Sequence, residues 1–148
     1  SYDGHKFTPI EYGAITTPAG QKLTDRLRDI YESVCTLIEK YHPDAFSIEE
    51  LFFNTNVKTA ISVAHGRGVC VLAATVLNVP VFEYTPLQIK QAVAGYGRAQ
   101  KPQVQRMVTQ MLNLNAVPKP DDVADALAIA MCHGYSAQYH NLLHEEGI

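Results

Sequence analysis

The sequence has 148 residues, which is enough for one domain with a substantial core but too few for two large ones. No stretch approaches the roughly 20 uninterrupted apolar residues of a membrane span, and no basic leader precedes an apolar run, so we expect a soluble cytoplasmic protein. The three cysteines are odd in number and far apart, which argues against a disulfide framework or a zinc ribbon.

The net charge of −3 is unevenly distributed along the chain. Residues 51–120 hold seven basic residues and one acid, a net charge of +6, whereas the remainder carries −9. This split fits a basic surface around an acidic cluster, as a metal-dependent nuclease requires. It fits a solvated surface of mixed charge equally well, because neighbours in sequence need not be neighbours in space.

The first residues, SYDGHKF, predict a hairpin turn at Asp3 and Gly4, followed by a strand from about Lys6 to Thr16. Only a stub of the first hairpin arm is present, and the chain begins with Ser1 rather than Met. We therefore expect that N-terminal sequence precedes Ser1, and that this segment lacks part of its sheet.

Apolar residues at steps of three and four predict a long helix over residues 21–41, which Pro43 ends. A compact apolar strand is expected over 44–52, then a polar loop at 54–56 and a second helix over 57–77. Glycines in the GRG run of that second helix lower its helix propensity. They indicate either close packing against a neighbouring strand or backbone approach to a ligand.

The second half of the chain alternates in the same way. A strand is expected at 81–84, then a helix at 85–93 that Thr85 and Pro86 open. Residues 94–102 form a basic loop that lacks the spacing of a phosphate-binding P-loop. Helices at 102–112 and 120–143 follow. Interleaved strands and helices predict a single α/β domain with a mixed sheet.

Three acids are candidates for chemistry. Asp122 and Asp125 lie one helical turn apart on the same face of the last helix, where acids also serve as caps and complement the helix dipole. Glu49 ends a strand and could face them across a cleft. The histidines lack zinc-site spacing, and His65, the most suggestive of them, is better interpreted as a surface residue. Oxygen ligands without histidine favour Mg²⁺ or Mn²⁺.

Five motifs, SIEELFF, AHGRGV, VFEYTPLQIKQAVAGYG, AQKPQVQRMV and DDVADALAIA, resemble in order the RuvC Holliday junction resolvases of bacteria. The resemblance runs from about Tyr12 to His133. It implies a ribonuclease H-like fold, with a mixed five-stranded sheet flanked by helices, and a homodimer that nicks four-way DNA junctions symmetrically with Mg²⁺. It also implies the RuvA–RuvB branch-migration complex as a partner. The alternatives are a junction-binding module without cleavage and another ribonuclease H-like nuclease.

Carried over by position, the resemblance makes Glu49, Asp122 and Asp125 three of four acids that bind two metal ions. Two such ions activate a water and stabilise the leaving 3′ oxygen during attack on a phosphodiester. Lys90 and Lys101 match lysines that the family needs for cutting, the alternative being ordinary solvated lysines.

The remaining candidates concern DNA binding. Phe52 matches an aromatic residue that wedges into the junction, although core packing is its alternative. Asn56 and Arg67 match polar positions near the cleft. Lys58 and Arg98 are candidate phosphate contacts on charge alone.

This sequence differs from the family pattern at the fourth acid, which in the family is an aspartate in a GIDPG-type turn at the end of the first strand. No such motif occurs in this sequence, and Asp3 follows the place of that strand. Asp121 is not at the matched position and is better interpreted as a helix cap. We therefore expect an incomplete two-metal site and an N-terminally incomplete nuclease domain. A lesser departure is Gly66, where the family commonly has Ala.

Overall fold

The computed structural model describes the backbone of residues 1–51 and 57–145, with the side chains of residues 1–51 and 60–138. Its contacts divide the chain into two compact units. Unit 1 contains Ser1–Ala14, Ser47–Glu50 and Glu83–Ile148, and unit 2 contains Ile15–Phe46 and Leu51–Phe82. Within the described residues, no helix combines the length and the apolar character that crossing a membrane demands.

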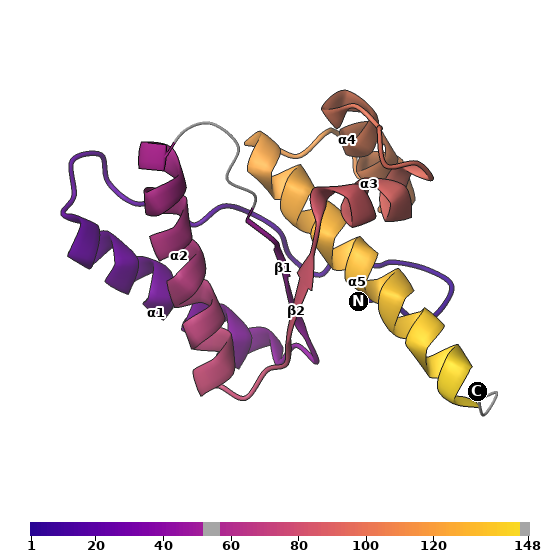
Figure 1. Cartoon of the computed structure of the whole chain (residues 1–148), viewed down its shortest axis with the longest axis horizontal. Helices are drawn as coiled ribbons and strands as arrows, with labels where there is room; N and C mark the ends of the chain where they lie inside the picture. Colours follow the sequence, from indigo (N-terminus) through magenta and orange to yellow (C-terminus); the bar gives the residue numbers. More distant parts are fainter. Residues whose placement is uncertain (52–56, 146–148) are drawn as a thin grey trace. The chain divides into compact units, whose positions relative to one another are not determined.

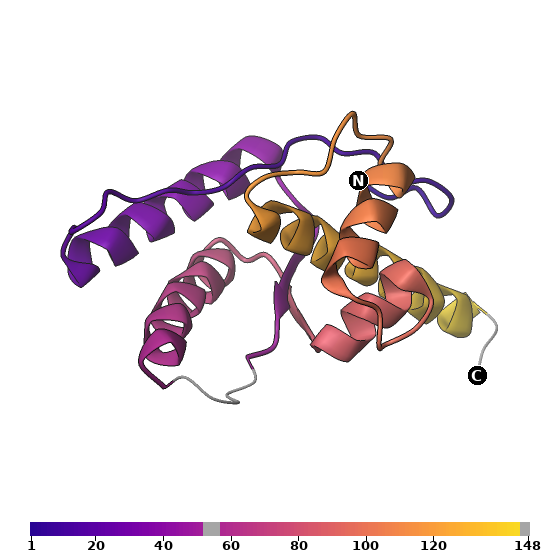
Figure 2. The ribbon, with the colours of Figure 1, turned by 90° about the horizontal axis from the view of Figure 1, so that it is seen from above.

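Unit 2 is built on two helices that lie side by side, α1 (Leu23–Tyr41) and α2 (Val57–Val76) (Figure 1, Figure 2). Both predicted helices are confirmed to within two residues. The apolar face of α1 buries Val34 and Ile38 against Ala73, Ala74 and Val79. His42 ends α1 in the left-handed conformation, with a φ of 46°, and its backbone N–H donates to the carbonyl of Ile38.

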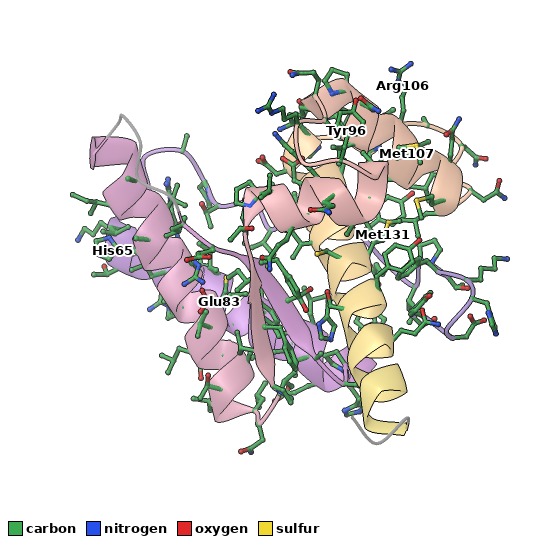
Figure 3. The ribbon with its side chains drawn as sticks, turned by 45° about the vertical axis from the view of Figure 1, so that its right-hand side comes forward. His65, Glu83, Tyr96, Arg106, Met107 and Met131 are labelled. Atoms are coloured by element: carbon green, nitrogen blue, oxygen red, sulfur yellow. The ribbon has the colours of Figure 1, made fainter. Side chains whose placement is uncertain are left out.

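The two glycines of the GRG run lie inside α2 without breaking it. A Cβ atom added to Gly66 or Gly68 would meet no described atom within 4 Å. Close packing against a strand therefore does not explain either glycine, and that interpretation was wrong for the described part of the chain. His65, beside them, is exposed on α2 as expected (Figure 3).

Two short strands, β1 (Phe46–Glu49) and β2 (Val81–Tyr84), pair with each other. The N–H of Phe46 donates to the carbonyl of Pro80 (2.8 Å), and that of Glu50 donates to Tyr84 (2.9 Å). The residue numbers rise together on both strands, so the pair is parallel, with α2 in the crossover connection. The α/β class is confirmed. Of the expected five strands, the described residues form these two, and the strand expected over 44–52 is shorter than predicted.

The turn at Asp3 and Gly4 forms as predicted. Asp3 Oδ1 accepts hydrogen bonds from the backbone N–H groups of His5 (2.8 Å) and Lys6 (2.7 Å), and these bonds lower the pKa of Asp3. The strand predicted from Lys6 to Thr16 was wrong, because only a single bridge pairs Tyr2 with Phe7. A strand needs a neighbouring strand to pair with, and the described residues 8–16 are assigned to no strand.

Unit 1 packs three helices, α3 (Pro86–Ala94), α4 (Lys101–Met111) and α5 (Asp121–Glu145), against one another. Met131 of α5 is almost fully buried in the core that these three helices share (Figure 3). The core residues are Phe7, Tyr84, Ile89, Val93, Ala99, Val104, Val108, Leu112, Ala128, Met131 and Cys132.

The N-terminal turn is fastened to the second half of α5. The ring of Tyr2 stacks on that of Phe7 at 4.1 Å, and both meet Tyr135 edge-on. Tyr2 Oη also donates to Gln138 Oε1 at 2.6 Å. A Cβ atom on Gly134 would lie only 2.6 Å from Phe7 Cε1, so glycine permits this close approach.

A half-buried histidine should make the stability of unit 1 depend on pH. His133 Nδ1 shares a hydrogen bond of 2.8 Å with Tyr84 Oη, and burial lowers the pKa of His133 below its ordinary 6.5. As the pH falls, His133 of the unfolded chain therefore takes up a proton at a higher pH than His133 of the folded chain does. The contribution of neutral His133 to the free energy of unfolding is fully present above pH 6.5. It is lost as the pH falls through the lowered pKa of the folded state. Urea unfolding of His133→Gln should show a weaker decline in stability between pH 7 and 5 than the wild type does, and an unchanged decline would contradict this role of His133.

Candidate active site

A pocket of about 270 Å³ opens in unit 1 beside the carboxyl end of β1. Parallel strands commonly present ligand sites at this end. Two carboxylates and two ammonium groups share the pocket with an apolar floor, so it holds charge of both signs. Its lining residues are Glu49, Pro86, Ile89, Lys90, Lys101, Val104, Asp125, Ala128 and Ile129.

Glu49 is the last residue of β1 and its side chain is exposed on the pocket side. Desolvation by the surrounding protein raises the pKa of Glu49, and the negative charge of Asp125 raises it further. The positive charges of Lys101 and Lys90 act in the opposite direction. The pocket therefore disfavours an uncompensated second carboxylate, which is the electrostatic setting that a bound cation relieves.

Lys101 and Asp125 form an ion pair across the pocket. Lys101 is the first residue of α4, and its Nζ donates to Asp125 Oδ2 at 2.9 Å. Both side chains remain 40–50% exposed. The hydrogen bond to Asp125 raises the pKa of Lys101, so its ammonium group stays charged at neutral pH.

Lys90 reaches the pocket from α3, whose start is fixed locally. The side chain of Thr85 accepts from the backbone N–H of Gln88, and the Gln88 side chain accepts from the backbone N–H of Thr85. Pro86 occupies the first turn, where its missing N–H costs no hydrogen bond. This capping box stabilises the start of the helix that carries Lys90. The sequence predicted the helix start at Thr85 and Pro86 but not the part that Gln88 plays in it.

The last helix presents its three acids differently. Asp125 lines the pocket, whereas Asp122 is exposed and does not line it, although its charge helps to raise the pKa of Lys101. Asp121 lies in the first turn, as expected of a residue at a helix start, and binds Lys119 Nζ at 2.7 Å. Of the three acids predicted to form one site, the structure therefore places only Glu49 and Asp125 in the same pocket.

The donor set suits one hard divalent cation. Within the described residues, no three histidine, cysteine or acidic side chains gather as metal ligands would. Mg²⁺, however, is commonly bound through one or two carboxylates together with waters and substrate phosphate. Glu49 and Asp125 meet that requirement, and a second ion would need donors beyond these two.

The DNA-binding candidates fall in several places. Arg98 is exposed in the loop between α3 and α4, two positions after Tyr96, which Figure 3 labels. Arg67 lies half-buried on α2 in unit 2. Phe52 and Asn56 lie outside the described residues, as does the side chain of Lys58, so their predicted contacts with DNA stay predictions.

Sequence reasoning missed the Lys101–Asp125 ion pair and the apolar floor. Twenty-four positions separate the paired residues, and no local pattern links them. The floor did have a signal: Ala128 and Ile129 follow Asp125 by three and four residues, and therefore share its face of the helix.

Comparison with known proteins identifies the family. The family model described as "Crossover junction endodeoxyribonuclease RuvC" matches residues 1–133. The chain belongs to the RuvC family. RuvC of Ruminiclostridium cellulolyticum is 61% identical over 142 residues, which cover 96% of this chain and 86% of that protein. RuvC of Clostridioides difficile is 54% identical, with coverage of 99% and 86%.

Solved RuvC structures agree with the fold. The Thermus thermophilus RuvC structure matches with a TM-score of 0.78 and 36% identity, covering 85% of this chain and 76% of that one. T. thermophilus RuvC in complex with Holliday junction substrate matches with a TM-score of 0.80 at the same identity, with coverage of 84% and 76%. RuvC membership confirms the resemblance that the five motifs carried and the ribonuclease H-like fold class.

Proposed function

We propose that this chain is a Holliday junction resolvase, a metal-dependent endonuclease that hydrolyses phosphodiester bonds in four-way DNA junctions. The observation that carries the proposal is the pocket that joins Glu49 and Asp125 to Lys90 and Lys101. Membership of the RuvC family and the likeness to a relative solved with its junction substrate support the same conclusion. We propose that both units are parts of one nuclease domain, and the family match across residues 1–133 supports this.

In the proposed reaction, Glu49 and Asp125 would hold Mg²⁺, for which Mn²⁺ could substitute. A bound ion of this kind lowers the pKa of water and stabilises charge on phosphate oxygens. Lys90 and Lys101 bind non-bridging oxygens of the scissile phosphate and orient it for attack. Water attacks phosphorus, the bond to the 3′ oxygen breaks, and the products are a 3′-hydroxyl and a 5′-phosphate. Asp122 is the acid we propose as a further donor for a second ion.

The DNA path continues beyond the pocket in this proposal. Arg98 contacts backbone phosphate beside α4, and Arg67 and Lys58 do the same from α2. Phe52 stacks at the junction centre, and Asn56 lies near it. Cleavage takes place on the bacterial chromosome in the cytoplasm, with the RuvA–RuvB branch-migration complex as partner.

We propose that the protein forms a homodimer through one face of α2. Ile61, Leu72 and Val76 are each more than half exposed, and His65 and Gly68 lie between them on the same face. The spacing of four, three, four and four residues is close to the seam of paired helices. A two-fold dimer through this face would offer two pockets to a nearly two-fold junction.

Leu72→Glu should therefore convert the dimer to a monomer, because it places a charge in the apolar seam. Sedimentation velocity at micromolar concentration measures the change in mass. Leu87→Glu is the control, since Leu87 is equally exposed but lies on α3. A Leu72→Glu protein that stays dimeric would remove α2 from the interface.

The function itself is tested with the natural full-length protein, a synthetic four-way junction and a linear duplex of the same sequence. With Mg²⁺ we expect paired nicks at symmetric positions in the junction, an intact duplex, and no nicks once a chelator is added. Junction binding without nicks at any Mg²⁺ or Mn²⁺ concentration would instead favour the binding module. Cleavage of duplex or RNA at equal rates would contradict junction selectivity.

A further inference from the structure

The ion pair between Lys101 and Asp125 sets two cations in competition for one carboxylate. Asp125 Oδ2 accepts from Lys101 Nζ at 2.9 Å, which is within the usual distance range of a charge-assisted hydrogen bond. The same carboxylate is one of the two that the pocket offers to a divalent ion. A divalent ion on that oxygen and the ammonium group of Lys101 would repel each other at close range, so each weakens the binding of the other there.

Lys101 has room to leave. Its side chain is 49% exposed and that of Asp125 is 40% exposed, so neither is locked by packing. Lys101 stands at the first position of α4, and its four-carbon stem lets the ammonium group swing without moving the helix. Pairs as exposed as this one are weak, typically worth a fewfold in an equilibrium constant.

We infer that Lys101 is an exchangeable occupant of the metal site: it neutralises Asp125 until a backbone phosphate draws it away and leaves the carboxylate to the divalent ion. This inference rests on the proposed function and deepens it, because it couples metal binding to substrate binding. Phosphate is the natural alternative partner, since Lys101 lines the pocket that the scissile strand would enter. By linkage, DNA raises the affinity for metal and metal raises the affinity for DNA by the same factor.

Lys90 provides the matched control. It lines the same pocket and its charge acts on Glu49, as that of Lys101 does, but the hydrogen bond to Asp125 belongs to Lys101. Removing either lysine removes one positive charge from the pocket. Only the removal of Lys101 also frees the carboxylate.

The experiment is a titration of the full-length protein with Mn²⁺ in the absence of DNA, with free Mn²⁺ read by electron paramagnetic resonance. We expect Lys101→Met to lower the Kd for Mn²⁺ by about twofold to fivefold relative to Lys90→Met. Lys101→Arg, which keeps the ion pair, should bind Mn²⁺ as weakly as the wild type. Lys101→Gln repeats the test with a polar side chain, and circular dichroism checks folding.

A second arm measures the coupling in a Glu49→Gln background, where we expect the junction to stay intact. Substrate phosphate is itself a metal ligand, so junction DNA should tighten Mn²⁺ binding in both variants, but at least about threefold more in Glu49→Gln than in Glu49→Gln with Lys101→Met. Equal Mn²⁺ affinities of Lys101→Met and Lys90→Met would overturn the inference, because charge alone would then explain the change. If the protein cleaves no junction but the Lys101→Met shift appears, the proposed resolvase function fails while this inference stands.

Discussion

Asp125→Asn should abolish junction cleavage, with a fall in rate of about 10³-fold, while junction binding is kept. Asparagine preserves the size of the side chain and removes the charge that both the metal ion and Lys101 require. The half-exposed position means that the helix should tolerate the change. Single-turnover cleavage of a labelled junction gives the rate, and a gel-shift assay at the same salt concentration gives the affinity.

The chain offers a control four residues away. Asp121 stands on the same helix but binds Lys119 outside the pocket, so Asp121→Asn should change the cleavage rate less than about threefold. Glu49→Gln and its neighbour Glu50→Gln form a second matched pair, of which only Glu49 lines the pocket. Cleavage that survives both Asp125→Asn and Glu49→Gln would show that the pocket is not the active site.

Gly134→Ala should destabilise the fold by about 1–2 kcal/mol, even though alanine is the better helix former. The new methyl carbon would lie 2.6 Å from Phe7 Cε1 and 3.3 Å from Tyr2 Cβ. An aromatic ring packed in a cluster has no flexible end that can move aside, so the N-terminal turn must shift from α5. Urea unfolding measures the loss, and a Phe7→Leu background should reduce it.

Gly66→Ala is expected to have the opposite sign. Gly66 also lies within a helix, but no described atom lies within 4 Å of an added Cβ. Alanine should therefore stabilise the protein by about 0.5–1 kcal/mol through helix propensity alone. A stabilising Gly134→Ala or a destabilising Gly66→Ala would show that these two glycines have been assigned the wrong roles.

Local patterns predicted the elements whose signals are contained in a short stretch. The periodicity of α1, the Thr85 cap of α3 and the compact run of β2 each depend on neighbours within a few residues. The strand predicted from Lys6 to Thr16 failed because strand formation depends on a partner that the local sequence does not specify.

The candidate site shows the same difference between local signals and contacts that depend on distant residues. Glu49 and Asp125 were predicted because each occupies a position that is recognisable from its neighbours in sequence, one at a strand end and the other at a helix start. The family motifs then indicated that the two acids act together. The ion pair with Lys101 was out of reach, since it depends on how α4 packs on α5. Asp122 shows the limit of helical spacing: sharing a face with Asp125 does not bring it into the same pocket.

The hydrogen bond between Tyr2 and Gln138 spans 136 positions of a 148-residue chain. During synthesis, the N-terminal turn therefore emerges long before the helix that holds it. Unit 2 is complete once residue 82 has appeared and can form its core early, whereas unit 1 must wait for α5. Because the pocket belongs entirely to unit 1, the candidate catalytic groups come together only after α5 has been synthesised.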